Sequence, residues 1–187
     1  MSRPAVILIF LVLNSCALFP EKPVQVYQLS RMQNLQHQLK WFFSGRLNLT
    51  NEKDSVSASI SWRHLPEQDD IELLGPLAQG RLAITLFPDK IIFDDGEHRR
   101  QYSGRIDDVL AEQLGFDLPA HALRFWVLGV NDPQQAYTEV SEGFMQNGWL
   151  VRYKELLQVN TDWLPKKISA EKDKTRVKLV IDQWELS

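Results

Sequence analysis

The chain has 187 residues, of which 21 are basic and 24 acidic, so its formal net charge at pH 7 is −3. A mildly acidic surface argues against nucleic-acid binding, which needs a basic face, and against a strong electrostatic hold on anionic lipid. Six tryptophans and nine phenylalanines are a heavy aromatic load for this length, and they either fill a large core or line something apolar.

The first 15 residues have the three parts of a secretory signal. Arg3 supplies positive charge, the nine residues from Ala5 to Leu13 form an apolar core, and Asn14 and Ser15 are small or polar. A helix that crosses a bilayer needs about 20 apolar residues, so this core is too short to span one. We therefore predict that residues 1–15 are a signal peptide that is cleaved after Ser15.

Cys16 is the only cysteine of the chain and directly follows the predicted cleavage site. This placement resembles the lipobox of bacterial lipoproteins, in which the thiol takes a diacylglyceryl group and the new amino terminus is acylated. The alternative is an ordinary signal peptide with a chance cysteine near its end. Ala17, in place of aspartate, resembles the outer-membrane address of enterobacterial lipoproteins. We expect residues 16–23 to be a lipidated tether and residues 24–187 to form a single domain.

The first expected element of this domain is an amphipathic helix from Val24 to Trp41, whose apolar residues recur near helical spacing. The period then changes to two. From Val56 to Trp62, for example, apolar residues alternate with small ones, which indicates a half-buried strand. The strands expected in this half of the chain are residues 47–49, 55–62, 71–74, 82–86, 91–93 and 99–102.

Helical spacing returns in the middle of the chain. Residues 106–114 predict a helix with Asp107 and Asp108 in its first turn and Gly115 at its end. A second helix is expected to follow Pro119 and to end at Gly129. The remaining expected strands are residues 137–144, 149–153, 168–170 and 177–181.

Together these elements predict an α+β fold that is mainly β. Strict alternation gives each strand one wet face and one apolar face, and a sheet of about ten or eleven strands has to curl. Three helices are available to cover the apolar side. The arrangement that we favour is an unclosed antiparallel β-barrel whose helices cover an internal apolar cavity.

The sequence offers little support for catalysis or for metal binding. The four histidines, His37, His64, His98 and His121, fall in different elements and lack paired ligand spacing. The chain has neither a GxSxG elbow nor a glycine loop that could cradle phosphate. The acid pairs 69–70, 94–95 and 107–108 lie at expected turns or a helix start, where acids serve solvation and capping. Catalysis by a carboxylate pair stays open, but no pair stands out, and we expect no enzyme activity and no metal site.

Three apolar features have both a structural and a functional interpretation. Leu77 lies at the tip of the turn between Gly75 and Gly80, where it is either presented to water or folded back on the sheet. The helix within residues 118–129 is apolar nearly all round, so it packs in the core or borders a cavity. The tryptophans could likewise fill a core or line a pocket for acyl chains; they are Trp62, Trp126, Trp149, Trp163 and Trp184.

From about Leu35 to Trp184 the chain resembles the LolB family of outer-membrane lipoproteins, which receive lipoproteins from a periplasmic carrier and insert them in the membrane. Besides the lipobox, the resemblance rests on segments in the family's order. They include Phe-Ser-Gly-Arg at 43–46, Leu-Leu-Gly-Pro-Leu at 73–77, Leu-Pro at 118–119, Leu-Arg-Phe-Trp-Val-Leu-Gly at 123–129, Asn-Gly-Trp at 147–149, Leu-Pro at 164–165 and Asp-Gln-Trp at 182–184. The turn reads Gly-Pro-Leu-Ala where many members have Asn-Pro-Leu-Gly, so the leucine is kept while the first and fourth residues of the turn differ.

The resemblance implies an unclosed barrel with a helical lid over an acyl-binding cavity, formed by residues 24–187 as a lipoprotein-binding domain. It implies that Leu77 aids delivery into the bilayer. Our candidates for the cavity wall are Trp62, Leu82, Ile84, Trp126, Trp149 and Val151. The implied partners are a LolA-like periplasmic carrier, an acylated lipoprotein cargo and outer-membrane lipid. We expect a monomer, anchored on the periplasmic face of the outer membrane, with no cofactor besides the diacylglyceryl and N-acyl lipid on Cys16.

A mechanism follows from the energetics of acyl chains. Burial of a methylene group from water is worth ~0.8 kcal/mol, so a lipoprotein needs an apolar host to cross water. The chain has no nucleotide-binding motif, and transfer is therefore expected to run downhill in affinity from carrier to this protein to bilayer. Two other functions stay open: a lipoprotein that binds a different apolar ligand, and a structural or assembly lipoprotein whose aromatic residues are all core.

Overall fold

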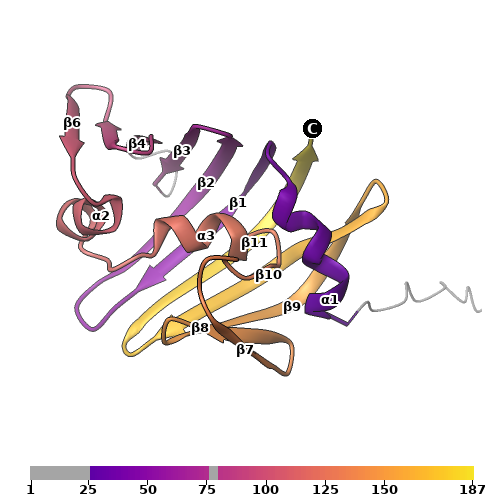
Figure 1. Cartoon of the computed structure of the whole chain (residues 1–187). Coiled ribbons are helices and arrows are strands. Elements are labelled where there is room, and N and C mark those ends of the chain that lie inside the picture. The colour runs from indigo at the N-terminus through magenta and orange to yellow at the C-terminus, as the bar shows by residue number, and fades with distance from the viewer. Residues whose placement is uncertain (1–25, 76–79) are drawn as a thin grey trace, which may run out of the picture.

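One antiparallel sheet of eleven strands dominates the part of the chain that the computed structural model describes, residues 26–75 and 80–187 (Figure 1). The signal segment, Cys16 and Leu77 lie outside the described residues. The strands are β1 (Trp41–Thr50), β2 (Ser55–Leu65), β3 (Gln68–Leu74), β4 (Arg81–Leu86), β5 (Lys90–Asp94), β6 (Arg99–Ser103), β7 (Tyr137–Val140), β8 (Gly143–Gln146), β9 (Trp149–Val159), β10 (Asp162–Lys172) and β11 (Thr175–Leu186). The predicted mainly β fold is confirmed.

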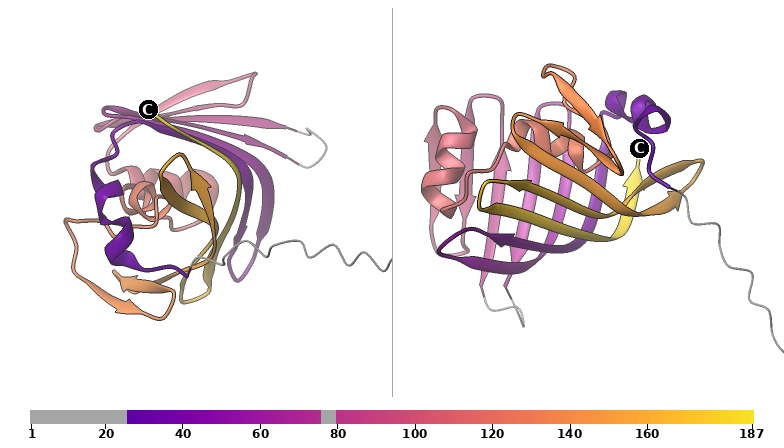
Figure 2. Two further views of the ribbon diagram at one scale, coloured as in Figure 1. Left: turned by 90° about the vertical axis from the view of Figure 1, so that its right-hand side faces the viewer. Right: turned by 90° about the horizontal axis from the view of Figure 1, so that it is seen from below.

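The sheet has two arms that meet at β1. This strand pairs with β2 on one side and with β11 on the other, so the strand order is β6-β5-β4-β3-β2-β1-β11-β10-β9-β8-β7. In the described structure β6 and β7 form the two outer edges and do not pair with each other. The sheet curls around the helices, as the end-on view in Figure 2 shows. This arrangement is the unclosed antiparallel barrel that the sequence predicted.

A glycine allows the two arms to meet closely. The register between β1 and β11 shifts after Ser44, where Gly45 faces Ile181. A Cβ atom on Gly45 would lie 2.2 Å from the carbonyl oxygen of Val180, a distance that no larger residue tolerates. Irregularities of this kind increase the local twist of a sheet, and this one lies where the sheet turns from one arm into the other.

Four short helical segments lie on the concave side of the sheet: α1 (Leu29–Met32), the 3₁₀ segment η1 (Gln33–His37), α2 (Ile106–Leu114) and α3 (Ala120–Trp126) (Figures 1 and 2). The bounds of α2 are those predicted, and its last turn closes on Gly115, which has a positive φ of 77°. In the described ranges, no helix is long and apolar enough to cross a membrane.

The first helical region is shorter than the sequence predicted. Helical structure ends at His37, and Gln38 already has an extended ψ of 106°. Trp41 does not end a helix but begins β1, where its ring lies 5.3 Å from that of Trp62 and 6.0 Å from that of Trp184. Burial of this aromatic group in the sheet outweighs the helical spacing of the preceding residues.

A second difference concerns residues 137–144, which were expected to form one strand. They belong instead to the hairpin of β7 and β8, whose turn holds Glu142 at a positive φ of 61°. The next residue, Gly143, has to be glycine, because a Cβ atom at this position would lie 1.9 Å from the carbonyl oxygen of Val151. Glycine after a polar pair is a turn signal that the alternation of apolar residues concealed.

Buried apolar side chains form two clusters. The larger one joins β1, β2 and β8–β11 to α1, η1 and the end of α3, and it holds all the buried tryptophans. The smaller one joins β4 and β5 to α2 and includes Ile84, Phe93 and Leu110. Ile71, Leu73 and Leu114 are half-buried and pack against both clusters. The space between the two clusters is where the candidate site lies.

Candidate functional site

An apolar cavity of about 80 Å³ lies between the concave face of the sheet and helices α2 and α3. Every residue of its wall is apolar. The sheet contributes Leu47, Leu49, Ile60, Trp62, Ile71, Leu73, Ile84, Leu86, Val177 and Leu179, and the helical region contributes Leu110, Leu114, Leu118, Ala120, Leu123 and Val127. A wall without any polar side chain can host hydrocarbon and offers nothing to a polar ligand.

The wall is formed by apolar residues that recur at strand spacing on the sheet and at helical spacing on α2. On the strands, inward side chains recur every second residue, and the register brings Ile71 of β3 opposite both Trp62 and Ile84. On α2, Leu110 and Leu114 are four residues apart and therefore share one face. Helix α3, which follows α2 after residues 115–119, contributes Ala120 and Leu123 to the same wall. The wall thus combines residues of both core clusters, which are bridged by Ile71, Leu73 and Leu114.

Trp62 is held in the wall by two polar partners behind it. Its indole Nε1 donates a hydrogen bond to Oδ1 of Asp69 over 2.8 Å, and Nδ1 of His64 lies 2.7 Å from the same oxygen. His64 stacks on Trp41 at a centroid distance of 5.1 Å. All four side chains are buried. The carboxylate therefore fixes the indole with its polar edge turned to Asp69, and the ring takes part in the apolar wall.

This position of Asp69 corrects the expectation that the pair 69–70 serves solvation at a turn. Only 7% of Asp69 is exposed, and its cross-strand neighbour is His64. Asp107 also does more than favour the start of a helix, because its Oδ1 accepts a hydrogen bond of 2.9 Å from the backbone N–H of Ala120. That bond ties α2 to α3, and burial raises the pKa of Asp107 above its ordinary value.

The structure divides the predicted wall residues into three groups. Trp62 and Ile84 line the cavity. Leu82 is half-buried on β4 and packs against the smaller cluster beside the cavity. The other three candidates, Trp126, Trp149 and Val151, are buried in the larger cluster. Contact of Trp62 and Ile84 with acyl chains stays a prediction.

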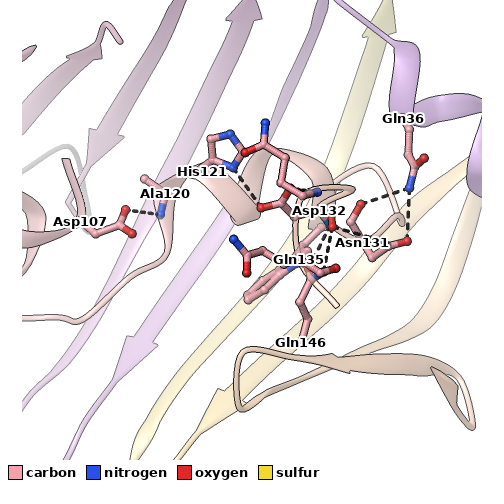
Figure 3. Close-up of polar contacts among 10 residues, drawn as sticks. Gln36, Asp107, Ala120, His121, Asn131, Asp132, Gln135 and Gln146 are labelled. Atoms are coloured by element: carbon pink, nitrogen blue, oxygen red, sulfur yellow. Dashed lines mark hydrogen bonds and ion pairs between the residues drawn. The ribbon is translucent and has the colours of Figure 1, made fainter. Parts of the chain in front are cut away.

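Trp126, the last residue of α3, donates into a polar network around Gln146; Figure 3 labels Asp132, Gln135 and Gln146 of this network. The Nε1 of Trp126 donates to Oε1 of Gln146 over 2.9 Å, and the same oxygen accepts the backbone N–H of Asp132. Gln146 in turn donates to the carbonyl oxygens of Asp132 and Gln135. This buried glutamine thereby anchors the loop after α3 to strand β8, which fixes the end of the helix.

The leucines of α2 and α3 are functional candidates that the prediction missed. Leu110, Leu114 and Leu123 were each assigned to helices, but their part in the wall depends on how the helices cross the sheet. The four-residue spacing of Leu110 and Leu114 was the available signal, because it places both side chains on one face of the helix. In residues 26–75 and 80–187, no group of three histidine, aspartate or glutamate side chains is arranged to hold a metal ion.

Comparison with known proteins gives matches that span most of the chain. Residues 39–184 match the model of the family described as outer membrane lipoprotein LolB. The outer-membrane lipoprotein LolB of Chromohalobacter salexigens is 31% identical over 85% of this chain and 75% of its own length. That of Alkalilimnicola ehrlichii is 29% identical over 95% of this chain and 93% of its own length.

The fold also has a counterpart among solved structures. A LolA superfamily protein from Nitrosomonas europaea superposes with a TM-score of 0.52, covering 87% of this chain and 94% of its own. The sequences are only 8% identical, so this likeness concerns the fold alone. The unclosed sheet with helices on its concave side is therefore shared well beyond recognisable sequence similarity.

Proposed function

This chain belongs to the outer membrane lipoprotein LolB family, and we propose that it receives the acyl chains of lipoproteins in the cavity between its sheet and helices α2 and α3. It is an outer-membrane lipoprotein of the machinery that localises lipoproteins. The observation that carries the proposed site is the wall of the cavity, whose sixteen residues are all apolar. Its action is binding and release without catalysis.

The size of the cavity implies that its walls move. An apolar cavity of ~150 Å³ binds a molecule as small as benzene, whereas this one has about 80 Å³. A long acyl chain can enter only if the two clusters separate, and half-buried Ile71, Leu73 and Leu114 lie at that junction. Each methylene that enters contributes ~0.8 kcal/mol, which offsets the cost of opening.

The membrane end of the process rests on residues outside the described ranges. We propose that Cys16 carries the diacylglyceryl and N-acyl lipid after removal of residues 1–15, and that it holds the protein on the periplasmic face of the outer membrane. On either side of Leu77 in the sequence, the Gly75 N–H donates a 3.0 Å hydrogen bond to the Gly80 carbonyl. This bond holds the two ends of the segment together, and we propose that Leu77 enters the bilayer during release.

The partners follow from the same reasoning. A LolA-like periplasmic carrier supplies the acylated cargo, the protein acts as a monomer, and outer-membrane lipid takes the cargo up. Because the sequence holds no nucleotide-binding motif, each step has to favour the next host, so affinity for acyl chains rises from the carrier to this protein to the bilayer.

The test is to incubate the purified mature chain with a lipoprotein bound to its carrier and to follow the lipoprotein by co-purification. We expect the lipoprotein to move to this chain and, when vesicles are added, into the membrane. Leu77→Glu should accept cargo normally but fail to deliver it. If the cargo stays on the carrier, the proposed function is wrong. This chain would then be better described as a lipoprotein that binds another apolar ligand, or as a structural lipoprotein.

A further inference from the structure

A second, polar pocket of about 160 Å³ adjoins the apolar cavity. Leu86 and Ala120 belong to the walls of both. The rest of the wall of the second pocket is mixed. Its polar residues are Glu67 from the turn after β2, Asp69 from β3, Asp107 from α2, and His121 and Arg124 from α3, and its apolar residues are Pro66, Phe87, Pro88 and Ile106. We call this second pocket, with Glu67, Asp107, His121 and Arg124, the polar vestibule.

Arg124 carries an unexplained donor into this region. Its Nε is buried, and it is the only buried side-chain nitrogen or oxygen in the described part of the chain that lacks a hydrogen-bond partner. A buried donor without an acceptor costs free energy, so native proteins rarely keep one without a reason. The guanidinium lies 5.6 Å from the ring of Phe125, a contact that holds the group but accepts none of its hydrogen bonds.

Two neighbouring polar side chains, His121 and Asp107, are held by hydrogen bonds, and each keeps one further polar atom that can bind a ligand. Nδ1 of His121 lies 3.1 Å from Oδ2 of the buried Asp132, which leaves Nε2 available (Figure 3). Oδ1 of Asp107 is bound to the Ala120 N–H, which leaves Oδ2 available. The polar vestibule therefore offers two side chains, His121 and Asp107, whose positions are set before any ligand arrives, a property that lowers the cost of binding.

We propose that the polar vestibule binds the ester and amide groups of the acylated cysteine of a cargo lipoprotein while its acyl chains occupy the apolar cavity. This assignment rests on the proposed function. In such a cargo the carbonyl oxygens lie directly where the chains end, so their host has to adjoin the apolar wall, as the polar vestibule does at Leu86 and Ala120. Arg124 donates to a carbonyl oxygen, and Asp107 or Glu67 accepts the amide N–H. His121 is exposed, so the cargo polypeptide can leave toward solvent on this side.

The first test compares two probes on the mature chain. Arg124→Met should weaken binding of a tripalmitoyl-cysteinyl-serine peptide by about tenfold, the usual effect of one lost charge-assisted hydrogen bond. The affinity for 1,6-diphenylhexatriene, a hydrocarbon without carbonyl or carboxylate groups, should change less than about twofold. Arg152→Met, at an exposed position of β9, is the matched control and should alter neither. An equal loss for both probes, or no loss for the peptide, would overturn the proposal.

The second test needs no variant and so does not depend on its folding. The wild-type chain should bind the tripalmitoyl peptide about tenfold more tightly than an analogue whose chains are joined through ethers and an amine, without carbonyl oxygens. Equal affinity for the two peptides would contradict the role of the polar vestibule. Failure of the proposed function looks different, because the wild-type chain would then bind neither cis-parinaric acid, an acyl chain, nor carrier-delivered lipoprotein.

Discussion

The carboxylate of Asp69 accepts the indole N–H of Trp62 over 2.8 Å, and both side chains are buried beside the apolar cavity. Trp62 lines that cavity, and Asp69 does not. The pair thus links a buried charged residue of β3 to the shape of the site on β2.

Replacement of Asp69 tests this link. Asp69→Leu leaves the N–H of Trp62 and the Nδ1 of His64 buried without a partner, and each such loss costs about 1–3 kcal/mol. We expect the free energy of unfolding in urea to fall by about 2–4 kcal/mol and parinaric acid to bind more weakly. Asp182→Asn is the control, because its ion pair with Arg46 is exposed and such pairs contribute little. Equal stability of the two variants would show that Asp69 does not support the wall.

A polar group in the wall should weaken binding of acyl chains. Leu73 lines the cavity and is half-buried, so Leu73→Gln brings an amide without a partner into contact with hydrocarbon. We expect the dissociation constant of parinaric acid to rise at least about tenfold, which corresponds to ~1.4 kcal/mol. Ser59→Gln, at an exposed position of the adjacent strand, should bind normally. Normal binding by both variants would mean that the acyl chain lies elsewhere.

Replacement of Trp126 should lower stability and leave the binding of acyl chains unchanged. This residue fills the larger cluster and donates to Gln146, but it does not line the cavity. Trp126→Phe loses that hydrogen bond and some volume, so we expect a loss of about 1–3 kcal/mol in the free energy of unfolding. Binding of parinaric acid at a temperature where the variant is folded should be unchanged. A weaker affinity without loss of stability would return Trp126 to the site.

The raised pKa of Asp107 predicts how the stability of the protein depends on pH. Burial raises its pKa in the folded protein above the ordinary value of 3.8, so the native state binds its proton more readily than the unfolded state does. The contribution of this residue to stability therefore declines as pH rises from 3.8 through the raised pKa.

Asp107→Asn removes this titration and keeps an oxygen that can accept the Ala120 N–H. Relative to wild type, we expect the variant to gain stability over that pH range and then to keep a constant advantage. Urea titrations at a series of pH values measure the difference, with Asp108→Asn on the exposed side of α2 as the control. A difference that does not vary with pH would show that Asp107 is not perturbed by burial.

Much of the fold could be predicted because its signals are local. The alternation from Val56 to Trp62 and the caps around residues 106–114 depend on neighbours in sequence alone. Trp41 could not be assigned in this way, since its place in β1 is decided by edge-to-face contacts with Trp62 of β2 and Trp184 of β11, which are distant in the chain.

The site was predictable only in part for the same reason. Trp62 and Ile84 follow from the strand pattern, but the part played by Leu110 and Leu123 depends on how the helices cross the sheet. The burial of Asp69 follows from the register of one hairpin, which pairs it with His64. A turn at Pro66 and Glu67 would have indicated that pairing, whereas an acid pair alone does not.

The most direct test of the account is to ask which face of α2 touches the acyl chains. A photo-reactive benzoylphenylalanine is placed at Leu114, which lines the cavity, or at Glu112, which is exposed on the same helix. After transfer from the carrier, we predict that an acylated lipoprotein cross-links through its acyl chains to position 114 and not to position 112, and that the same protein without acylation does not cross-link. Cross-linking to position 112 alone, or to neither position when the lipoprotein co-purifies with the chain, would contradict the assignment of the cavity.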